Sequence, residues 1–112
     1  MGWTIESALD HKLLSHKFKF LSEYRFVLGE LSPMITIRIY KQADMENYWF
    51  QQSHFIKTPT QMGPYQTSRQ YEDSEAYALH RAVNSLTQYY DEAVAQGHKP
   101  NDAWLVPNDS FY

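Results

Sequence analysis

The chain contains no cysteine, only four glycines and no long apolar run. The absence of cysteine excludes disulfide bonds, thiolate zinc sites and cysteine nucleophiles. The glycines are scattered at positions 2, 29, 63 and 97, so no glycine-rich phosphate-binding loop is present. The apolar runs, such as residues 48–50, are far shorter than the roughly 20 residues that span a membrane. We therefore expect no membrane-spanning segment.

The first residues also lack the features of a targeting signal. Residues 1–6 have neither the basic start nor the apolar middle of a secretion signal. Glu6 stands where a myristoylation signal has Ser or Thr. We therefore expect a cytoplasmic protein without membrane attachment.

Charge is distributed unevenly along the 112 residues, whose net charge is −3. Residues 1–71 hold eight Lys and Arg against six Asp and Glu, whereas residues 72–112 hold two against seven. A surface that binds duplex nucleic acid needs several clustered cations. Only Lys12, Lys17 and Lys19 approach such a cluster. This distribution disfavours double-stranded nucleic acid as a partner.

Aromatic residues are abundant, at 16% of the sequence with nine Tyr. Tyr and Trp combine a large apolar ring with a polar group, which suits both a small core and an interface. The length fits one domain, residues 1–112, and 43% hydrophobic residues is typical of a folded chain.

The first half of the chain predicts a short helix followed by strands. Apolar residues recur at helical spacing in residues 3–15, with Thr4 as the expected cap, although position 7 lacks the acid of a capping box. Residues 34–41 and 47–57 alternate with a period of two, which predicts two strands. An earlier strand is predicted from Phe18 onward, with a bend near residues 21–22. One set of its apolar side chains lies at even-numbered positions and is expected on one face: Phe18, Phe20, Tyr24, Phe26 and Leu28.

The second half predicts a loop, a short strand and a long helix. Two prolines make residues 58–64 a loop, and residues 65–71 alternate as a short fourth strand. Residues 74–96 predict a helix that Asp73 caps and Gly97 ends. Its apolar stripe is formed by Ala76, Leu79, Val83, Leu86, Tyr90, Ala93 and Val94.

The order of these elements predicts a two-layer α+β fold. A meander of three or four antiparallel strands is packed by the long C-terminal helix, and a short helix precedes it. Residues 103–106 are expected to pack back as an extended tail or edge strand.

Catalytic and metal-binding patterns are missing. The five histidines show no metal-ligand spacing, and no nucleophile elbow is present. We expect no metal, no cofactor and no enzymatic activity. An enzyme remains an alternative, with His54 or His80 acting beside Tyr65 or Glu72.

The segment 57–75 combines an irregular Pro/Gly loop, aromatic rings, a cation and an acidic helix start, which favours a binding site. A packed hairpin with no binding role is the alternative, and helix capping would explain the acidic residues. The candidate binding residues are Tyr65, Arg69, Tyr71, Glu72, Asp73 and Glu75.

These features predict a small intracellular protein-binding module, an adaptor or inhibitor. Its acidic and aromatic surface would meet a basic surface, such as that of a nucleic-acid-handling bacterial or phage-related protein. A free edge strand also leaves room for a homodimer.

The alternative is single-stranded nucleic-acid binding through stacked aromatic rings. Its aromatic candidates are Tyr48, Trp49, Phe50, Tyr65 and Tyr71, and its cations are Lys12, Lys17, Lys19, Arg25 and Arg38.

Overall fold

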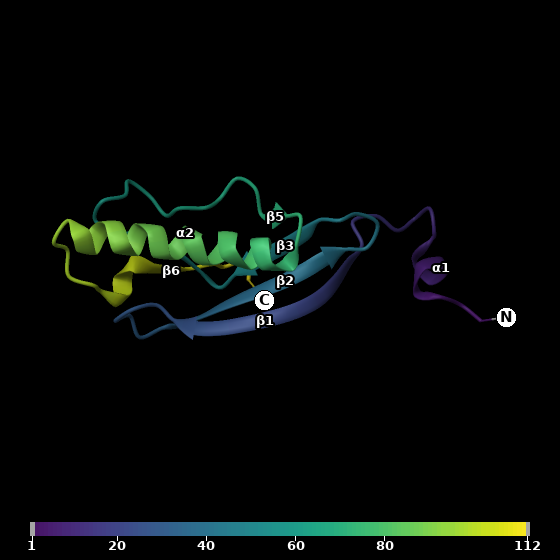
Figure 1. Ribbon diagram of the computed structural model, residues 1–112, viewed down its shortest axis with the longest axis horizontal. Coiled ribbons are helices and arrows are strands. Elements are labelled where there is room, and N and C mark those ends of the chain that lie inside the picture. The colour runs from purple at the N-terminus through teal and green to yellow at the C-terminus, as the bar shows by residue number, and fades with distance from the viewer. Residues whose placement is uncertain (1, 112) are drawn as a thin grey trace.

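An antiparallel four-stranded sheet carries one long helix on one face in the computed structural model, which describes residues 2–111 (Figure 1). The strands lie in the order β1, β2, β3 and β5, and α2 packs against the middle of the sheet. Their bounds are β1 (Phe18–Val27), β2 (Met34–Gln42), β3 (Tyr48–Gln52), β5 (Tyr71–Glu72) and α2 (Glu75–Ala95). The predicted α+β meander with a long C-terminal helix is confirmed.

The core lies between α2 and the inner face of the sheet. Ile35, Ile37 and Ile39 alternate along β2, point inward and are fully buried. Branched side chains of this kind fit a pleated surface with few rotamers lost. They meet a helix face of mostly small residues, Ala78, Ala82, Ser85, Leu86 and Ala93, which lets the two layers approach closely.

The ends of α2 follow the sequence with two corrections. Ser74, not Asp73, is the N-cap, and its hydroxyl accepts a hydrogen bond from the Tyr77 amide. The predicted stripe is wrong at its ends, because Ala76 and Val94 are exposed. Gly97 has φ +90° and ends the helix as predicted, with its amide donating to the carbonyl of Val94 at 3.0 Å.

A bulge in β1 changes which residues face the helix. Phe20 pairs with Tyr40, but the next paired residue is Ser22, so Leu21 is an extra residue. One inserted residue reverses the face of every side chain that precedes it. Phe18 and Phe20 therefore lie on the outer face, whereas the later members of the same parity set point inward. The sequence predicted a bend here but not this reversal.

The predicted third and fourth strands also need correction. The predicted third strand is interrupted at Ser53. After this residue, β4 (His54–Ile56) leaves the main sheet and pairs with β6 (Leu105–Pro107). The strand predicted for residues 65–71 is wrong except at its end, because only Tyr71 is in β5 and Tyr65 forms an isolated bridge. The predicted extended segment near the C-terminus corresponds to β6, after a 3₁₀ turn at Asp102–Trp104.

The first helix, α1 (Ile5–Leu9), is shorter than predicted and has no buried residue. Thr4 caps it as expected, and Ser7 takes the place of the missing acid and completes the capping box. Figure 1 shows α1 beyond the end of β1 and β2. Within residues 2–111, no helix combines the length and the apolar character that a membrane crossing requires.

Candidate binding surface

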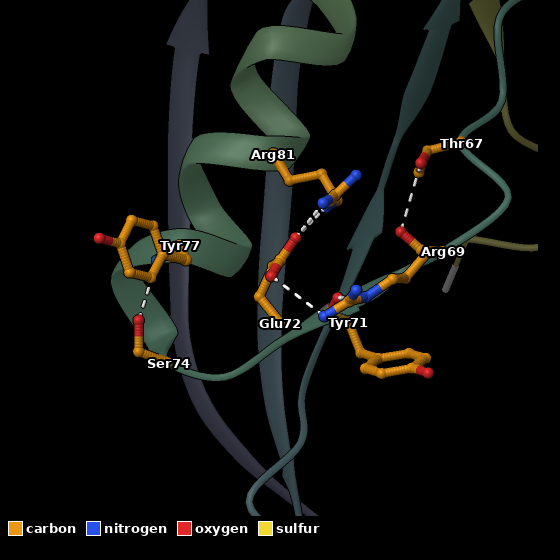
Figure 2. Close-up of polar contacts among 7 residues, drawn as sticks. All are labelled: Thr67, Arg69, Tyr71, Glu72, Ser74, Tyr77 and Arg81. Carbon is orange, nitrogen blue, oxygen red and sulfur yellow. Dashed lines mark hydrogen bonds and ion pairs between the residues drawn. The ribbon is translucent and has the colours of Figure 1, made fainter.

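The structure divides the predicted binding residues into two places. Arg69, Tyr71 and Glu72 meet beside the first turns of α2 (Figure 2). Tyr65 packs instead against Tyr89 of α2, with ring centroids 4.9 Å apart. The six predicted residues therefore do not form one surface.

The acidic residues at the start of α2 are engaged largely within the protein. Glu72 lies between two guanidinium groups: Arg69 approaches one carboxylate oxygen at 3.3 Å, and Arg81 binds the other (Figure 2). Glu75 accepts hydrogen bonds from the hydroxyl groups of Ser22, at 2.5 Å, and Tyr24, at 3.4 Å. Asp73 is exposed. Much of the negative charge that the sequence assigns to a docking surface therefore stabilises the helix start.

The outer face of the sheet carries a row of aromatic side chains. Phe20 pairs with Tyr40, Tyr40 with Trp49, and Trp49 with Tyr71, so the row crosses β1, β2, β3 and β5. Phe18 adds to it, with its ring 5.9 Å from that of Trp49. We call these five residues the aromatic face. The long helix packs on the opposite side of the sheet, as Figure 1 shows.

A cleft of about 390 Å³ opens on the aromatic face, and amide side chains border it. The indole Nε1 of Trp49 donates to Gln42 at 3.2 Å, so the polar edge of this ring already has a partner. The lining residues are Phe18, Tyr40, Trp49, Phe50, Gln51 and Gln70. The arrangement provides apolar ring surface together with amide groups that can donate and accept hydrogen bonds.

Charged groups beside the aromatic face are nearly balanced. Arg38 and Arg25 share the carboxylate of Glu23, at 2.7 and 2.8 Å. Arg38 is the main cause that holds the pKa of Glu23 below its ordinary value. The Arg38 guanidinium also lies 4.4 Å from the centre of the Phe111 ring, a cation–π arrangement. Two cations and one anion leave this cluster with one net positive charge.

Sequence reasoning found only part of the aromatic face. Trp49 and Tyr71 were among its stacking candidates, but Phe50 is buried in the core and Tyr48 points toward the helix side. Phe18, Phe20 and Tyr40 were missed as surface residues. The available signal was one aromatic residue in each of four predicted strands, but joining them in one row requires the register and the bulge.

The histidines of the enzyme alternative lie in different surroundings. His80 borders a hollow of about 310 Å³ together with Glu72, whose carboxylate is occupied by two arginines. The His54 ring lies 2.8 Å from the hydroxyl of Ser53, and burial lowers its pKa. Among residues 2–111, no group of three His, Asp or Glu side chains is placed to hold a metal ion.

No family model, curated protein or solved structure matches the chain. The role of the aromatic face is therefore argued from its own geometry.

Proposed function

We propose that this chain is a small protein-binding module, an adaptor or inhibitor, that contacts its partner through the aromatic face. The observation that supports this proposal is the row Phe20, Tyr40, Trp49 and Tyr71, which spans the sheet on the side opposite α2, with Phe20 exposed and the other three partly buried. Aromatic residues and arginine supply much of the binding energy in protein interfaces. An intracellular location belongs to the proposal and is consistent with a chain that has no cysteine.

The aromatic face replaces the acidic helix start as the proposed contact surface. Glu72 and Glu75 already bind side chains of the same chain, so a basic protein would have to replace these internal contacts. The rings of Phe18 and Phe20 are about half exposed and need no displacement. Apolar area that is already exposed is the cheaper area to bury against a partner.

A second candidate is a single-stranded nucleic acid, because Arg25, Arg38 and Arg69 lie near the aromatic face. The Arg69 guanidinium lies 4.9 Å from the centre of the Tyr71 ring. Two features favour a protein over this candidate. Neighbouring rings are inclined to one another by 40° to 87°, so they do not form one flat stacking platform. The arginines are also paired with carboxylates, whereas single-strand sites use a positively charged groove.

Site-specific photo-crosslinking tests the proposal. A photoreactive phenylalanine analogue replaces Phe20 in one variant and Tyr77, which is exposed on α2, in the control. Irradiation in the producing cells should give a discrete protein adduct from position 20 and none from position 77. An adduct that nuclease removes would support the nucleic-acid candidate. The absence of any adduct at position 20 would overturn the proposed surface.

A further inference from the structure

The N-terminal arm, residues 3–16, exposes large apolar side chains that have no place in the core. Trp3, Ile5 and Leu13 are each about four-fifths exposed. The only helix in the arm, α1, has five residues, which is too short to be stable in water by itself. An arm of this composition gains stability only by packing against another apolar surface.

Contacts at the base of the arm hold it away from its own aromatic face. Lys17 donates from Nζ to the carbonyl of Leu9 at 2.9 Å and pairs with Asp44 at 3.3 Å. The Lys17 carbonyl accepts a hydrogen bond from the Ala43 amide at 2.7 Å. These contacts tie the arm to the β2–β3 turn, so α1 lies beyond the end of the sheet (Figure 1).

The chain turns sharply where the arm joins β1. His16 has φ +52°, a left-handed conformation that non-glycine residues adopt at a cost. The resulting molecule is elongated, with extents of 64 × 24 × 23 Å. Its radius of gyration is 17.1 Å, against about 13 Å for a compact chain of this length. The arm therefore extends the molecule beyond the end of the sheet, and it joins β1 directly before Phe18 of the aromatic face.

We propose that a second copy of this chain is the occupant of the aromatic face, and that two copies exchange their N-terminal arms. This inference rests on the proposed function, because it identifies the protein that the aromatic face contacts as a second copy of the chain. Docking on a second copy leaves the Lys17 contacts intact, whereas folding back onto its own face would require the arm to break them. A two-fold arrangement gives each copy the same pair of contacts.

The charges and the area of the two surfaces agree with this occupant. The arm holds Glu6 and Asp10 against Lys12, one net negative charge, and the arginine cluster beside the aromatic face has one net positive charge. Trp3 keeps about four-fifths, and Phe18 and Phe20 about half, of the roughly 150–250 Å² of a large ring exposed, so these rings offer on the order of 700 Å² in two arms and two faces. Ile5 and Leu13, each about four-fifths exposed, add to this area and bring it toward the lower end of the range for a specific dimer.

Sedimentation of the purified full-length chain over a concentration series is the first test. We expect a dimer, with at least tenfold weaker association in Trp3→Ser/Leu13→Ser and in Phe20→Ser. All three substituted residues are exposed, so folding should survive, and circular dichroism verifies this. Met62→Ser, in a fully exposed loop position, is the matched control and should leave association unchanged. A dimer that persists in both interface variants would overturn arm exchange.

Introduced cysteines show which copy supplies the arm, because the natural chain has none. Gly2→Cys, directly before the arm, and Gln51→Cys in the cleft, prepared separately and mixed, should form a disulfide between copies. Gly2→Cys mixed with Gln66→Cys, beside Tyr89 in another hollow, should not. A disulfide within a single Gly2→Cys/Gln51→Cys chain at high dilution would overturn the exchange.

The two proposals fail in different ways. A chain that stays monomeric at all concentrations overturns self-association. If position 20 then still crosslinks to a different protein in cells, the aromatic face remains a protein-binding surface. If it crosslinks to nothing, both proposals are overturned.

Discussion

The central strand β2 presents different kinds of residue to the two faces of the sheet. Along β2, Ile35, Ile37 and Ile39 point toward α2 and are fully buried, while Arg38 and Tyr40 point outward. On β2, branched aliphatic side chains therefore face the helix, whereas an arginine and a ring face outward. The first composition is typical of a core and the second of an interface. The alternation of side chains along the strand therefore defines two faces, and the position of α2 determines which face becomes the core.

The largest expected effect contrasts Ile37→Ala on the inner face with Phe20→Ala on the outer face. Removing a fully buried branched side chain leaves a cavity, so the free energy of unfolding should fall by about 2–5 kcal/mol. Phe20 is half exposed and its removal leaves no cavity, so the loss should stay below about 1 kcal/mol. Urea unfolding at low protein concentration measures both without a contribution from association. Equal losses would mean that the outer face is a second core.

The next effect tests how closely Gly29 packs against α2. This residue has φ +54°, and a methyl group on it would overlap the hydroxyl of Tyr90 in α2. That hydroxyl accepts a hydrogen bond from the Glu30 amide at 3.1 Å. Gly29→Ala should therefore lower the free energy of unfolding by about 2–4 kcal/mol, from backbone strain and overlap together.

Gly97→Ala is the matched control for this effect. Gly97 also has a positive φ, +90°, but a methyl group there would meet only open space. Only the backbone cost remains, and the expected loss is about 1 kcal/mol. Thermal or urea unfolding compares the two variants. If Gly29→Ala costs no more than Gly97→Ala, the close approach of Tyr90 has no energetic consequence.

The sequence predicted the elements that local patterns determine. Alternation identified β2, and the glycine after the long helix identified its end, because both depend on residues close in the chain. Tertiary pairing determined the rest. The bulge at Leu21 depends on the register with β2, and the break at Ser53 accompanies the pairing of β4 with β6, which is distant in sequence. The site prediction named Tyr71 and Arg69 but not the face to which Tyr71 belongs.

A smaller effect concerns the pH dependence of stability at His54, in the two-stranded sheet beside the core. Burial lowers the pKa of this ring below 6.5, its value in an unfolded chain. The folded state therefore binds fewer protons than the unfolded state near that pH. The stabilising contribution is present above pH 6.5 and is lost as the pH falls through the folded pKa. Unfolding curves between about pH 7.5 and 5.5 should show this decline.

The variant His54→Gln should flatten the decline, because Gln does not titrate in this range. His80→Gln, which changes an exposed ring on α2, is the control and should retain it. If both variants decline as the natural chain does, another group is responsible for the pH dependence.

The smallest effect on stability belongs to the outer face, at Glu23. Its pKa is lowered mainly by Arg38, so its stabilising contribution is present above 4.5, the unfolded value, and is lost as the pH falls through the folded pKa. Glu23→Gln should lower the unfolding midpoint slightly at pH 7, and added salt should shrink the difference. A difference that does not shrink as the pH falls below 4.5 would contradict the ionic origin of the effect.

The same substitution discriminates between the two kinds of partner for the outer face. It leaves Arg25 and Arg38 without their shared carboxylate, so the positive charge beside the aromatic face increases. A face that binds single-stranded nucleic acid should then bind a labelled oligonucleotide more tightly, with a steeper salt dependence in fluorescence anisotropy. A face that binds an apolar arm should show no oligonucleotide binding in either form. Because the inner face and α2 are untouched, any gain in oligonucleotide binding would belong to the outer face and would favour the nucleic-acid candidate over the protein partner.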